Sequence, residues 1–402
     1  MHTQLPPELY EPIVNAISTV DRKTLLECCL AASVFRRPCQ KRLFMHLHIS
    51  PTPPGHSYAA VAAKLDQFPK LVDYCTNVHV VFPSCDSPEW EAERPIAEGV
   101  LRRLANIRMA NLLMRFPSSA TPNPGNFIIQ VTQWLLGVFE AHHQLERLES
   151  SSLLLTPTLF AQWLVGAPKA ALRYADIFTD QLASPDVLPP VPPRPLTRLL
   201  ISGSAGPCVL LGRPELQPYL RSVRELVQSL VEIQSQLSAC FTMAPIVERF
   251  ECHFASGALD WKALRLPTHF PRLRHLTLGI HSHDLPPLLP ALVQDGVPVL
   301  IGLRLELYVR TLLPEQLDKS LNSQSQLWLE LDNALATHGT LTTAEWFLSS
   351  KFPEEFPAVR TENKTARYAP VAAFSGKLAE RLPKAWERGL VVVDGVTIGV
   401  AF

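Results

Sequence analysis

The chain has 402 residues, and its 37 basic residues balance its 37 acidic residues, so the formal net charge is zero. This balance gives no support for a general binder of nucleic acids or anionic membranes, because such proteins normally carry a basic excess. Apolar residues make up 47% of the sequence, which is typical of an ordered protein. A chain of this length can form two or three domains, or one extended array of repeats.

The sequence predicts an intracellular protein, cytoplasmic or nuclear, that does not enter a membrane. No basic region followed by an apolar run begins the chain, and no apolar stretch reaches the roughly 18 residues that a membrane helix needs. The eight cysteines, which include the adjacent Cys28 and Cys29, are therefore expected to be reduced thiols. Proline supplies 37 residues, about 9% against roughly 5% in average usage, so we expect many breaks between short elements.

Three short helices are expected between residues 5 and 48, because apolar residues recur there at helical spacing. The apolar positions are Leu9, Ile13, Ala16 and Ile17 in the first helix, Leu25, Leu26, Cys29 and Leu30 in the second, and Leu43 and Phe44 in the third. Pro12 should kink or delay the first helix, since it removes a backbone hydrogen bond. Asp21 is a suitable N-cap for the second helix, and Pro38 should start the third.

A proline-rich stretch from Ser50 to Gly55 then interrupts all periodicity. Its three prolines favour a semi-rigid spacer between two domains. We therefore divide the chain into a helical domain at residues 1–49, a linker at 50–57 and a second domain at 58–402.

The second domain contains a weak repeat of the form L-x-x-L-x-L. Copies are expected to begin at Cys75, Leu104, Leu145, Leu172, Leu196, Val223, Val247, Leu273 and Leu300, with a last one around Leu327, Leu329 and Leu331. From Leu145 onward they follow one another at about 24 to 27 residues, inside the range of leucine-rich repeats. Each copy should form a short strand, with return helices such as 160–164 and 334–348. No repeat can bury its apolar face alone, so the pattern predicts an α/β fold, an irregular solenoid with a curved parallel sheet.

The first 48 residues resemble the F-box. Leu5-Pro6-Pro7-Glu8-Leu9 matches the family's opening L-P-x-E-L, Ile13 its next apolar position, and Arg42-Leu43-Phe44 its closing apolar pair. The chain departs from the family at Ala31, Ser33 and Phe35, where valine, arginine and tryptophan are usual. The later chain is similar to F-box proteins with irregular leucine-rich repeats that are abundant in mushroom-forming fungi, through the segments 68–74 and 387–391.

The resemblance implies the substrate-recognition subunit of an SCF-type cullin–RING ubiquitin ligase. Such a receptor is not an enzyme and needs no cofactor, because it only raises the concentration of its target beside the ubiquitin-charged enzyme. The F-box would dock on a Skp-type adaptor, and through it on a cullin. The residues expected to contact the adaptor are Leu5, Pro6, Glu8, Leu9, Ile13, Leu25, Leu26, Leu30 and Phe35.

The target protein is expected to bind the exposed face of the sheet, where charged and aromatic residues alternate with the apolar positions of the repeat. Aromatic residues and arginine dominate binding hot spots. The expected contacts are Arg108, Arg147, Glu149, Tyr174, Asp176, Arg198, Arg249, Glu251, His275, Arg304, Glu306 and Trp328. These residues could equally be only the solvated side of a sheet.

Two other functions and one structural alternative stay open. The chain could be a leucine-rich scaffold with a degenerate F-box and no role in ubiquitin transfer, or the first helices could simply cap the repeats. An unrecognised hydrolase would need a clustered nucleophile and base, which the sequence does not offer.

Two pairs of histidines have spacings that could ligate a metal, but neither has a second cluster at a diagnostic spacing, so we expect no metal. These are His46 with His48, and His281 with His283, the latter beside Asp284.

Overall fold

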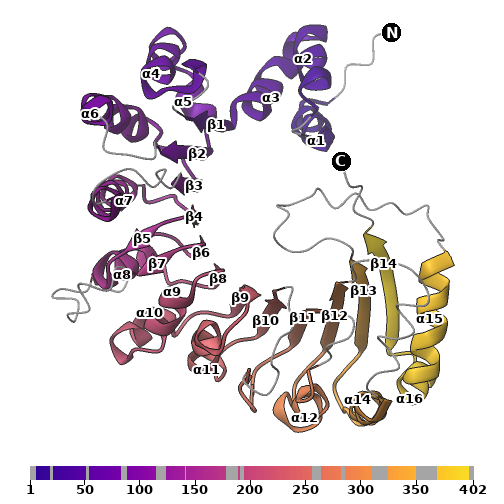
Figure 1. Ribbon diagram of the computed structural model, residues 1–402. Coiled ribbons are helices and arrows are strands. Elements are labelled where there is room, and N and C mark those ends of the chain that lie inside the picture. The colour runs from indigo at the N-terminus through magenta and orange to yellow at the C-terminus, as the bar shows by residue number, and fades with distance from the viewer. Residues whose placement is uncertain are drawn as a thin grey trace, which may run out of the picture. The chain divides into compact units, whose positions relative to one another are not determined.

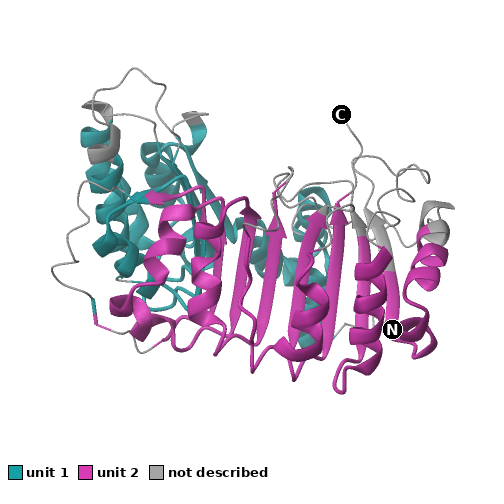
Figure 2. Cartoon of the chain, turned by 60° about the horizontal axis from the view of Figure 1, so that its bottom comes forward, with its two compact units in different colours: residues 1–171, 177–189 teal, residues 172–176, 190–402 magenta. Residues whose placement is uncertain are grey.

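The computed structural model describes residues 6–18, 21–50, 54–82, 88–114, 124–140, 142–177, 189–190, 194–255, 264–281, 286–308, 325–349 and 369–397. The chain divides into two compact units, which Figure 2 draws in different colours. Unit 1 comprises residues 1–171 and 177–189, and unit 2 comprises residues 172–176 and 190–402. The predicted α/β class is confirmed, since the strands form a large parallel sheet and alternate with helices along the chain.

Unit 1 begins with helices where the sequence predicts them. They are the 3-10 helix η1 (Pro7–Leu9) and the α-helices α1 (Tyr10–Ala16), α2 (Arg22–Ala31) and α3 (Ser33–Phe44). Asp21 caps α2 as predicted, because its carboxylate accepts hydrogen bonds from the backbone N–H of Thr24 at 3.1 Å and from its hydroxyl at 2.7 Å. The predicted start of the third helix at Pro38 is wrong. The extended backbone of Ala32 separates it from α2, so α3 begins at the next residue and includes Pro38.

The strands of unit 1 pair in parallel and in the order of the sequence (Figure 1). They are β1 (His46–Ile49), β2 (Asn77–Phe82), β3 (Met109–Met114) and β4 (Arg147–Ser151). The short β5 (Leu154–Leu155) is not part of this series and pairs in a separate two-stranded sheet. The connecting helices are η2 (Pro54–His56), α4 (Tyr58–Gln67), α5 (Leu71–Tyr74), α6 (Pro88–Arg103), α7 (Pro124–Glu140) and α8 (Pro157–Val165). Strands β6 (Lys169–Arg173) and β7 (Asp176–Ile177) lie where the chain passes from one unit to the other.

Unit 2 repeats this arrangement, with helices along one face of its strands (Figure 1). Its parallel strands are β8 (Arg198–Ser202), β9 (Glu225–Val231), β10 (Arg249–Phe254), β11 (His275–His281), β12 (Gly302–Tyr308), β13 (Thr343–Ser349) and β14 (Val391–Thr397). Its helices are α9 (Ala205–Leu211), η4 (Pro214–Leu216), α10 (Gln217–Leu220), η5 (Gln234–Leu237), α11 (Ser238–Met243), α12 (Leu289–Ala291), η6 (Leu292–Gly296), α14 (Ser325–Thr337), α15 (Ala369–Arg381) and α16 (Pro383–Glu387).

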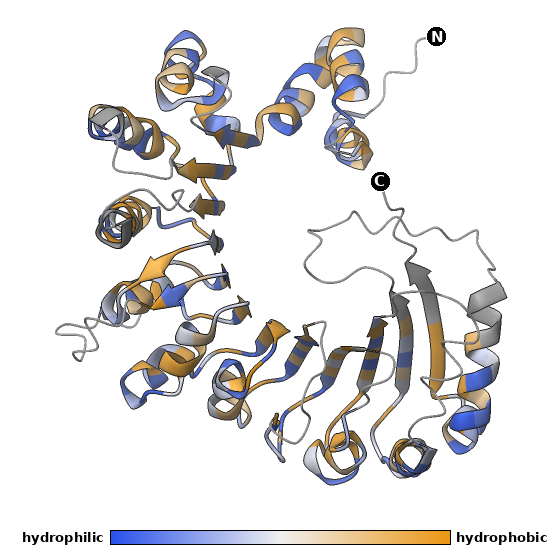
Figure 3. Cartoon of the chain, in the orientation of Figure 1, coloured by the Kyte–Doolittle hydropathy of each residue, from blue (hydrophilic) through white to orange (hydrophobic). Residues whose placement is uncertain are grey.

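Alternation of side chains explains why the repeat forms strands. Along β12, Leu303, Leu305 and Leu307 are buried, whereas Arg304 and Glu306 between them are partly exposed. Successive residues of a strand point to opposite faces, so one face packs on the helices and the other stays polar. Figure 3 shows this alternation as bands of opposite hydropathy along β11 and β12. The apolar positions of the repeats at Leu273 and Leu300 are therefore core positions, as predicted.

Two predicted repeats are out of register. The register aligns Ala110 of β3 with Val78 of β2, so the repeat placed at Leu104 begins three residues later. Its buried series is Ile107, Ala110 and Leu112. The repeat placed at Leu172 begins earlier, because β6 runs from Lys169 to Arg173, and its buried series is Ala167, Ala170 and Leu172. Alanine fills core positions in both, and a search for leucine-sized residues misses them.

The last predicted repeat is wrong. Leu327, Leu329 and Leu331 lie in α14, where Trp328, Leu331 and Leu335 form a buried helical face and Leu329 is half exposed. The strand is β13 (Thr343–Ser349), which overlaps the second half of the segment 334–348 that was predicted as a helix, whereas residues 334–337 are helical as the end of α14. Return helix 160–164 is confirmed as part of α8.

The C-terminal elements of unit 2 join through one buried carboxylate and two stacked indoles. Asp332 of α14 is fully buried, and its oxygens accept hydrogen bonds from the backbone N–H groups of Lys384 at 3.2 Å and Ala385 at 2.9 Å. These N–H groups are in the first turn of α16, where no helical acceptor exists, so Asp332 stabilises that helix from a different element. Trp328 stacks on Trp346 of β13 with ring centroids 5.4 Å apart.

Candidate protein-binding surfaces

The N-terminal helices enclose only a small core. Val14, Leu25 and Cys39 are fully buried at its centre, and Phe35 and Leu43 pack around them half buried. The ring of Phe35 meets the ring of Tyr10 edge to face, with centroids 5.5 Å apart. Phe35, which was predicted to contact an adaptor, thus packs on the inner side of the helices.

Other apolar side chains of these helices remain in solvent. The exposed fractions are 44% for Leu9, 39% for Ile13, 50% for Leu26, 84% for Leu30, 45% for Val34 and 38% for Phe44. Pro6 and Glu8 are also exposed. We call Leu9, Ile13, Leu26 and Leu30 the N-terminal apolar surface. Of the residues predicted to contact an adaptor, Leu25 is misplaced, because it is buried in the helical core, and Leu5 lies outside the described residues.

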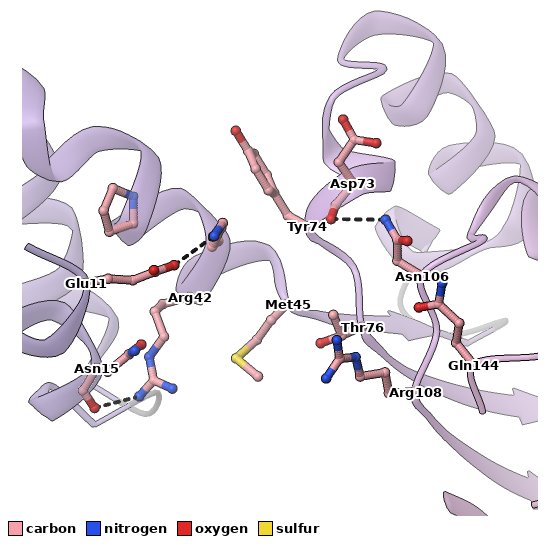
Figure 4. Close-up of a pocket in the computed structure, with 12 residues that line it drawn as sticks. Glu11, Asn15, Arg42, Met45, Asp73, Tyr74, Thr76, Asn106, Arg108 and Gln144 are labelled. Carbon is pink, nitrogen blue, oxygen red and sulfur yellow. Dashed lines mark hydrogen bonds and ion pairs between the residues drawn. The ribbon is translucent and has the colours of Figure 1, made fainter. Parts of the chain in front are cut away.

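A polar groove of about 510 Å³ lies between the N-terminal helices and the amino ends of the strands of unit 1 (Figure 4). Lys41 donates a 2.7 Å hydrogen bond to the carboxylate of Glu11, and this bond together with the lysine charge holds the pKa of Glu11 below its ordinary value. Arg42 donates to the backbone carbonyl of Ile17 at 2.8 Å, just beyond α1. These side chains therefore serve contacts within unit 1.

The face of the strands opposite the helices carries most of the residues predicted to bind a target. They lie on β4, β8, β10, β11 and β12, and they are Arg147, Glu149, Arg198, Arg249, Glu251, His275, Arg304 and Glu306. Arg108 directly precedes β3, and its guanidinium lies 3.6 Å from Glu146. Cross-strand and same-strand ion pairs are frequent on this face, such as Arg147 with Glu149 at 2.5 Å.

Three of the predicted target contacts lie elsewhere. Tyr174 falls between β6 and β7 with a positive φ of 50°, and Asp176 belongs to the two-residue strand β7. Trp328 is a buried residue of α14 and offers no surface to a partner. The prediction that Trp328 lies on a strand is wrong, because the apolar face of a helix and a leucine repeat both show apolar residues at short spacing.

A chain of hydrogen bonds crosses three strands of unit 2. His253 Nε2 donates to Glu251 Oε1 over 2.6 Å, and His253 Nδ1 lies 2.7 Å from the hydroxyl of Tyr308. That hydroxyl donates to Glu306 Oε2 at 3.2 Å, and Arg304 Nε donates to Glu306 Oε1 at 2.8 Å. We call these five residues the polar chain. Burial and the Glu306 carboxylate raise the pKa of Tyr308, so its hydroxyl keeps its proton.

The polar chain depends on Gly279. His253 is on β10 and Tyr308 on β12, so their contact passes over β11 between them. A Cβ at position 279 would stand 2.2 Å from His253 Nδ1 and 2.8 Å from the Tyr308 hydroxyl, so one or both of these side chains would have to move. Only glycine leaves room for the two side chains to meet.

Sequence reasoning named Glu251, Arg304 and Glu306 but missed His253 and Tyr308. Both follow the named residues at a spacing of two, which keeps them on the same face of their strands. The signal was therefore present, but the repeat pattern was followed only over its first six positions.

A hollow of about 290 Å³ opens on the same face beside the polar chain. Its lining comes from β9 to β13 and includes Glu225, Arg249, His275, Arg304 and Glu345. Gly302 also lines the hollow. It lies between His275 and Thr343, since a Cβ there would stand 3.1 Å from His275 Nδ1 and 3.5 Å from the hydroxyl of Thr343. We call this depression the strand-face hollow.

Histidines also gather at β1 and β2 of unit 1. The rings of His48 and His79 stack with centroids 4.9 Å apart, and Asn77 Nδ2 donates to His46 Nδ1 at 3.2 Å. Within the part of the chain that the structure describes, no three histidine, cysteine, aspartate or glutamate side chains are arranged to hold a metal ion. His281 belongs to β11, and His283 and Asp284 lie outside the described residues.

Comparison with models of known protein families gave no match, and a search among curated proteins also found none. None of the helices described here combines the length and the apolar character that crossing a bilayer requires.

Proposed function

We propose that the protein is a substrate-recognition subunit of an SCF-type cullin–RING ubiquitin ligase. The N-terminal helices would bind a Skp-type adaptor, and the polar face of the strands would bind the protein to be ubiquitinated. The observation that carries the proposal is the N-terminal apolar surface, on helices whose sequence resembles the F-box. Leu30, with 84% of its side chain in solvent, is its most exposed member.

The energetics favour a partner on these helices. A domain of about 40 residues is marginal alone and usually needs a partner or a staple. The described cysteines of the helices, Cys28, Cys29 and Cys39, are free thiols, so no disulfide supplies that staple. Fully burying a leucine-sized side chain contributes roughly 1.5–3 kcal/mol. Covering four such residues with an adaptor would therefore stabilise the complex substantially.

The polar face of unit 2 supports the second half of the proposal. Its charged side chains are held in defined positions by ion pairs and by the polar chain, so little side-chain entropy is left to lose when a partner docks. Arginine and tyrosine in such a setting are frequent in binding hot spots. Strands held in register by a parallel sheet present these groups on a rigid frame.

The adaptor contact is testable with the purified protein and a purified Skp-type adaptor. Leu26→Ser with Leu30→Ser should weaken adaptor binding by at least about a hundredfold, because each 1.4 kcal/mol is tenfold in affinity. Calorimetry or biolayer interferometry measures the change. Val209→Ser with Phe241→Ser is the matched control, since both residues are about half exposed on helices of unit 2.

Two results would contradict the proposal. Absence of adaptor binding by the wild-type protein removes the ubiquitin-ligase role. If proteins are still captured through the strand face, the chain is an interaction scaffold with a degenerate F-box. Equal binding by the leucine variant and the wild type would place the adaptor elsewhere on the chain.

A further inference from the structure

The strand-face hollow has a charge pattern that differs from the rest of the face. Its three carboxylates already have partners in unit 2, which are two arginines and a histidine. Glu225 lies 3.3 Å from Arg198, Glu251 2.6 Å from His253, and Glu345 3.6 Å from Arg304. The hollow therefore has no carboxylate free for a cationic ligand.

Arg249, in contrast to these carboxylates, has no oppositely charged partner in the part of the chain that the structure describes. Its side chain is exposed at the end of β10 nearest the hollow, and within the described residues it has no carboxylate partner. An arginine presents five N–H donors in a planar fork that matches a carboxylate. The donors of Arg249 are thus available to a ligand in the hollow.

The surroundings of His275 show which charged groups lie near this end of the hollow. It neighbours Arg249 in the register of β10 and β11, and its ring lies against Gly302, where a Cβ would stand 3.1 Å from His275 Nδ1. Burial and the positive charges of Arg249 and Arg274 hold the pKa of His275 below its ordinary value, although Glu345 acts in the opposite direction. Arg249 and Arg274 therefore place positive charge near this end of the hollow, where Glu225 also neighbours Arg249 in the register of β9 and β10.

The surrounding charges also limit the ligand to a single negative charge. Glu225, Glu251 and Glu345 stand around the hollow, and they would repel a phosphate dianion more strongly than a carboxylate. One unpaired arginine matches one carboxylate.

We infer that the strand-face hollow binds the carboxylate of an aspartate or glutamate side chain in an extended segment of the target protein, with Arg249 and His275 as its donors. The inference rests on the proposed function, because it assumes that this face receives the target. It names the chemistry of the contact, which the F-box resemblance does not.

The binding of a defined probe tests the inference on the full chain. The probe is a capped heptapeptide with one central glutamate among glycines and serines, and the matched peptide has glutamine in its place. NMR of histidine-labelled protein follows the imidazole signal of His275. The glutamate peptide should shift that signal saturably and raise the pKa of His275, because a bound carboxylate favours the imidazolium. The glutamine peptide should leave the signal unchanged.

Variants separate the site from a general charge effect. Arg249→Gln should weaken peptide binding by about tenfold, as expected for loss of a hydrogen bond to a charged group. Gly302→Val should also weaken it, because the added side chain would press on the His275 ring. Circular dichroism checks that this variant is folded. Arg272→Gln is the control, because Arg272 is exposed in the turn before β11 and does not line the hollow.

Three outcomes would overturn the inference. They are equal binding of the two peptides, unchanged binding by Arg249→Gln, and a His275 signal that responds to inorganic phosphate but not to the glutamate peptide. Peptide binding does not involve the N-terminal apolar surface. A failure to bind the adaptor would therefore refute the ubiquitin-ligase proposal and leave the carboxylate site in place.

Discussion

At the scale of single residues, Gly279 determines whether side chains of β10 and β12 can make contact across β11. The side chains of His253 and Tyr308 reach each other only because the strand between them has no side chain at that point. His253 is in turn the hydrogen-bond donor to Glu251. Although burial opposes it, this bond and the charges of His253, Arg198 and Arg304 hold the pKa of Glu251 below its ordinary value. One glycine thus controls the position of groups on both sides of it.

Gly279→Ala should destabilise unit 2 by about 1–3 kcal/mol, as expected for an added methyl group in a packed site. The added carbon forces His253 and Tyr308 apart and leaves their buried polar atoms unpaired. Urea unfolding measures the loss. Gly376→Ala is the matched control, because nothing lies within 4 Å of a Cβ there, and alanine in helix α15 should stabilise by about 0.5–1 kcal/mol. Equal effects of the two substitutions would contradict the role of the polar chain.

At the scale of elements, the pairing of β1 with β2 is sensitive to protons. Burial and nearby Arg42 hold the pKa of His46 below its ordinary value, and burial and the His48 imidazole do the same for His79, against the opposite effect of Glu149. His48 itself stacks on His79. Protonation of these rings would place like charges in contact between the two strands.

The stability of unit 1 should therefore fall as the pH drops below the ordinary histidine value of 6.5. In that range the unfolded chain binds more protons than the folded chain, so acid favours unfolding. Hydrogen exchange of residues 46–49 and 77–80, measured between pH 7.5 and 5.5, should show faster opening at the lower pH. His79→Gln should reduce this dependence. His269→Gln, at an exposed position of unit 2, should preserve it. A rate of opening that is independent of pH would refute the idea.

At the scale of the whole molecule, the parallel sheet and the polar face could be predicted from the sequence, because leucines at positions such as Leu276 and Leu278 alternate with polar residues. The predicted register of two repeats was wrong where alanine takes the place of leucine, at Ala110 and Ala170. A small buried side chain changes the hydropathy pattern too little to be recognised. The last repeat failed because an apolar helix face and a repeat both show leucines at short spacing. Contacts across strands, such as that over Gly279, depend on register and have no signature in a single sequence.

The N-terminal helices can be separated from β1, but β1 belongs with the strands. Its residues pair with β2, and Ile49 is fully buried. Deletion of residues 1–44 should leave the unfolding transition of the remaining chain unchanged. Deletion of residues 1–49 should lower its stability by roughly 1.5–3 kcal/mol through loss of the Ile49 side chain alone. Denaturant unfolding of the two truncated proteins compares them. Equal stability would mean that β1 contributes nothing to unit 1.

Sequence-ordered pairing also determines how unit 2 responds to mechanical force. Each strand from β9 to β13 is hydrogen-bonded to the strand before it and the strand after it in the chain, and β14 is bonded to β13. Tension applied at the β14 end therefore loads the hydrogen bonds between β13 and β14 first. The bonds between β12 and β13 are loaded only after β14 has detached. Unit 2 would extend by peeling one strand and its helix at a time. A pulled chain of this kind yields in a series of small steps rather than in one rupture, and it can refold from whatever strands remain.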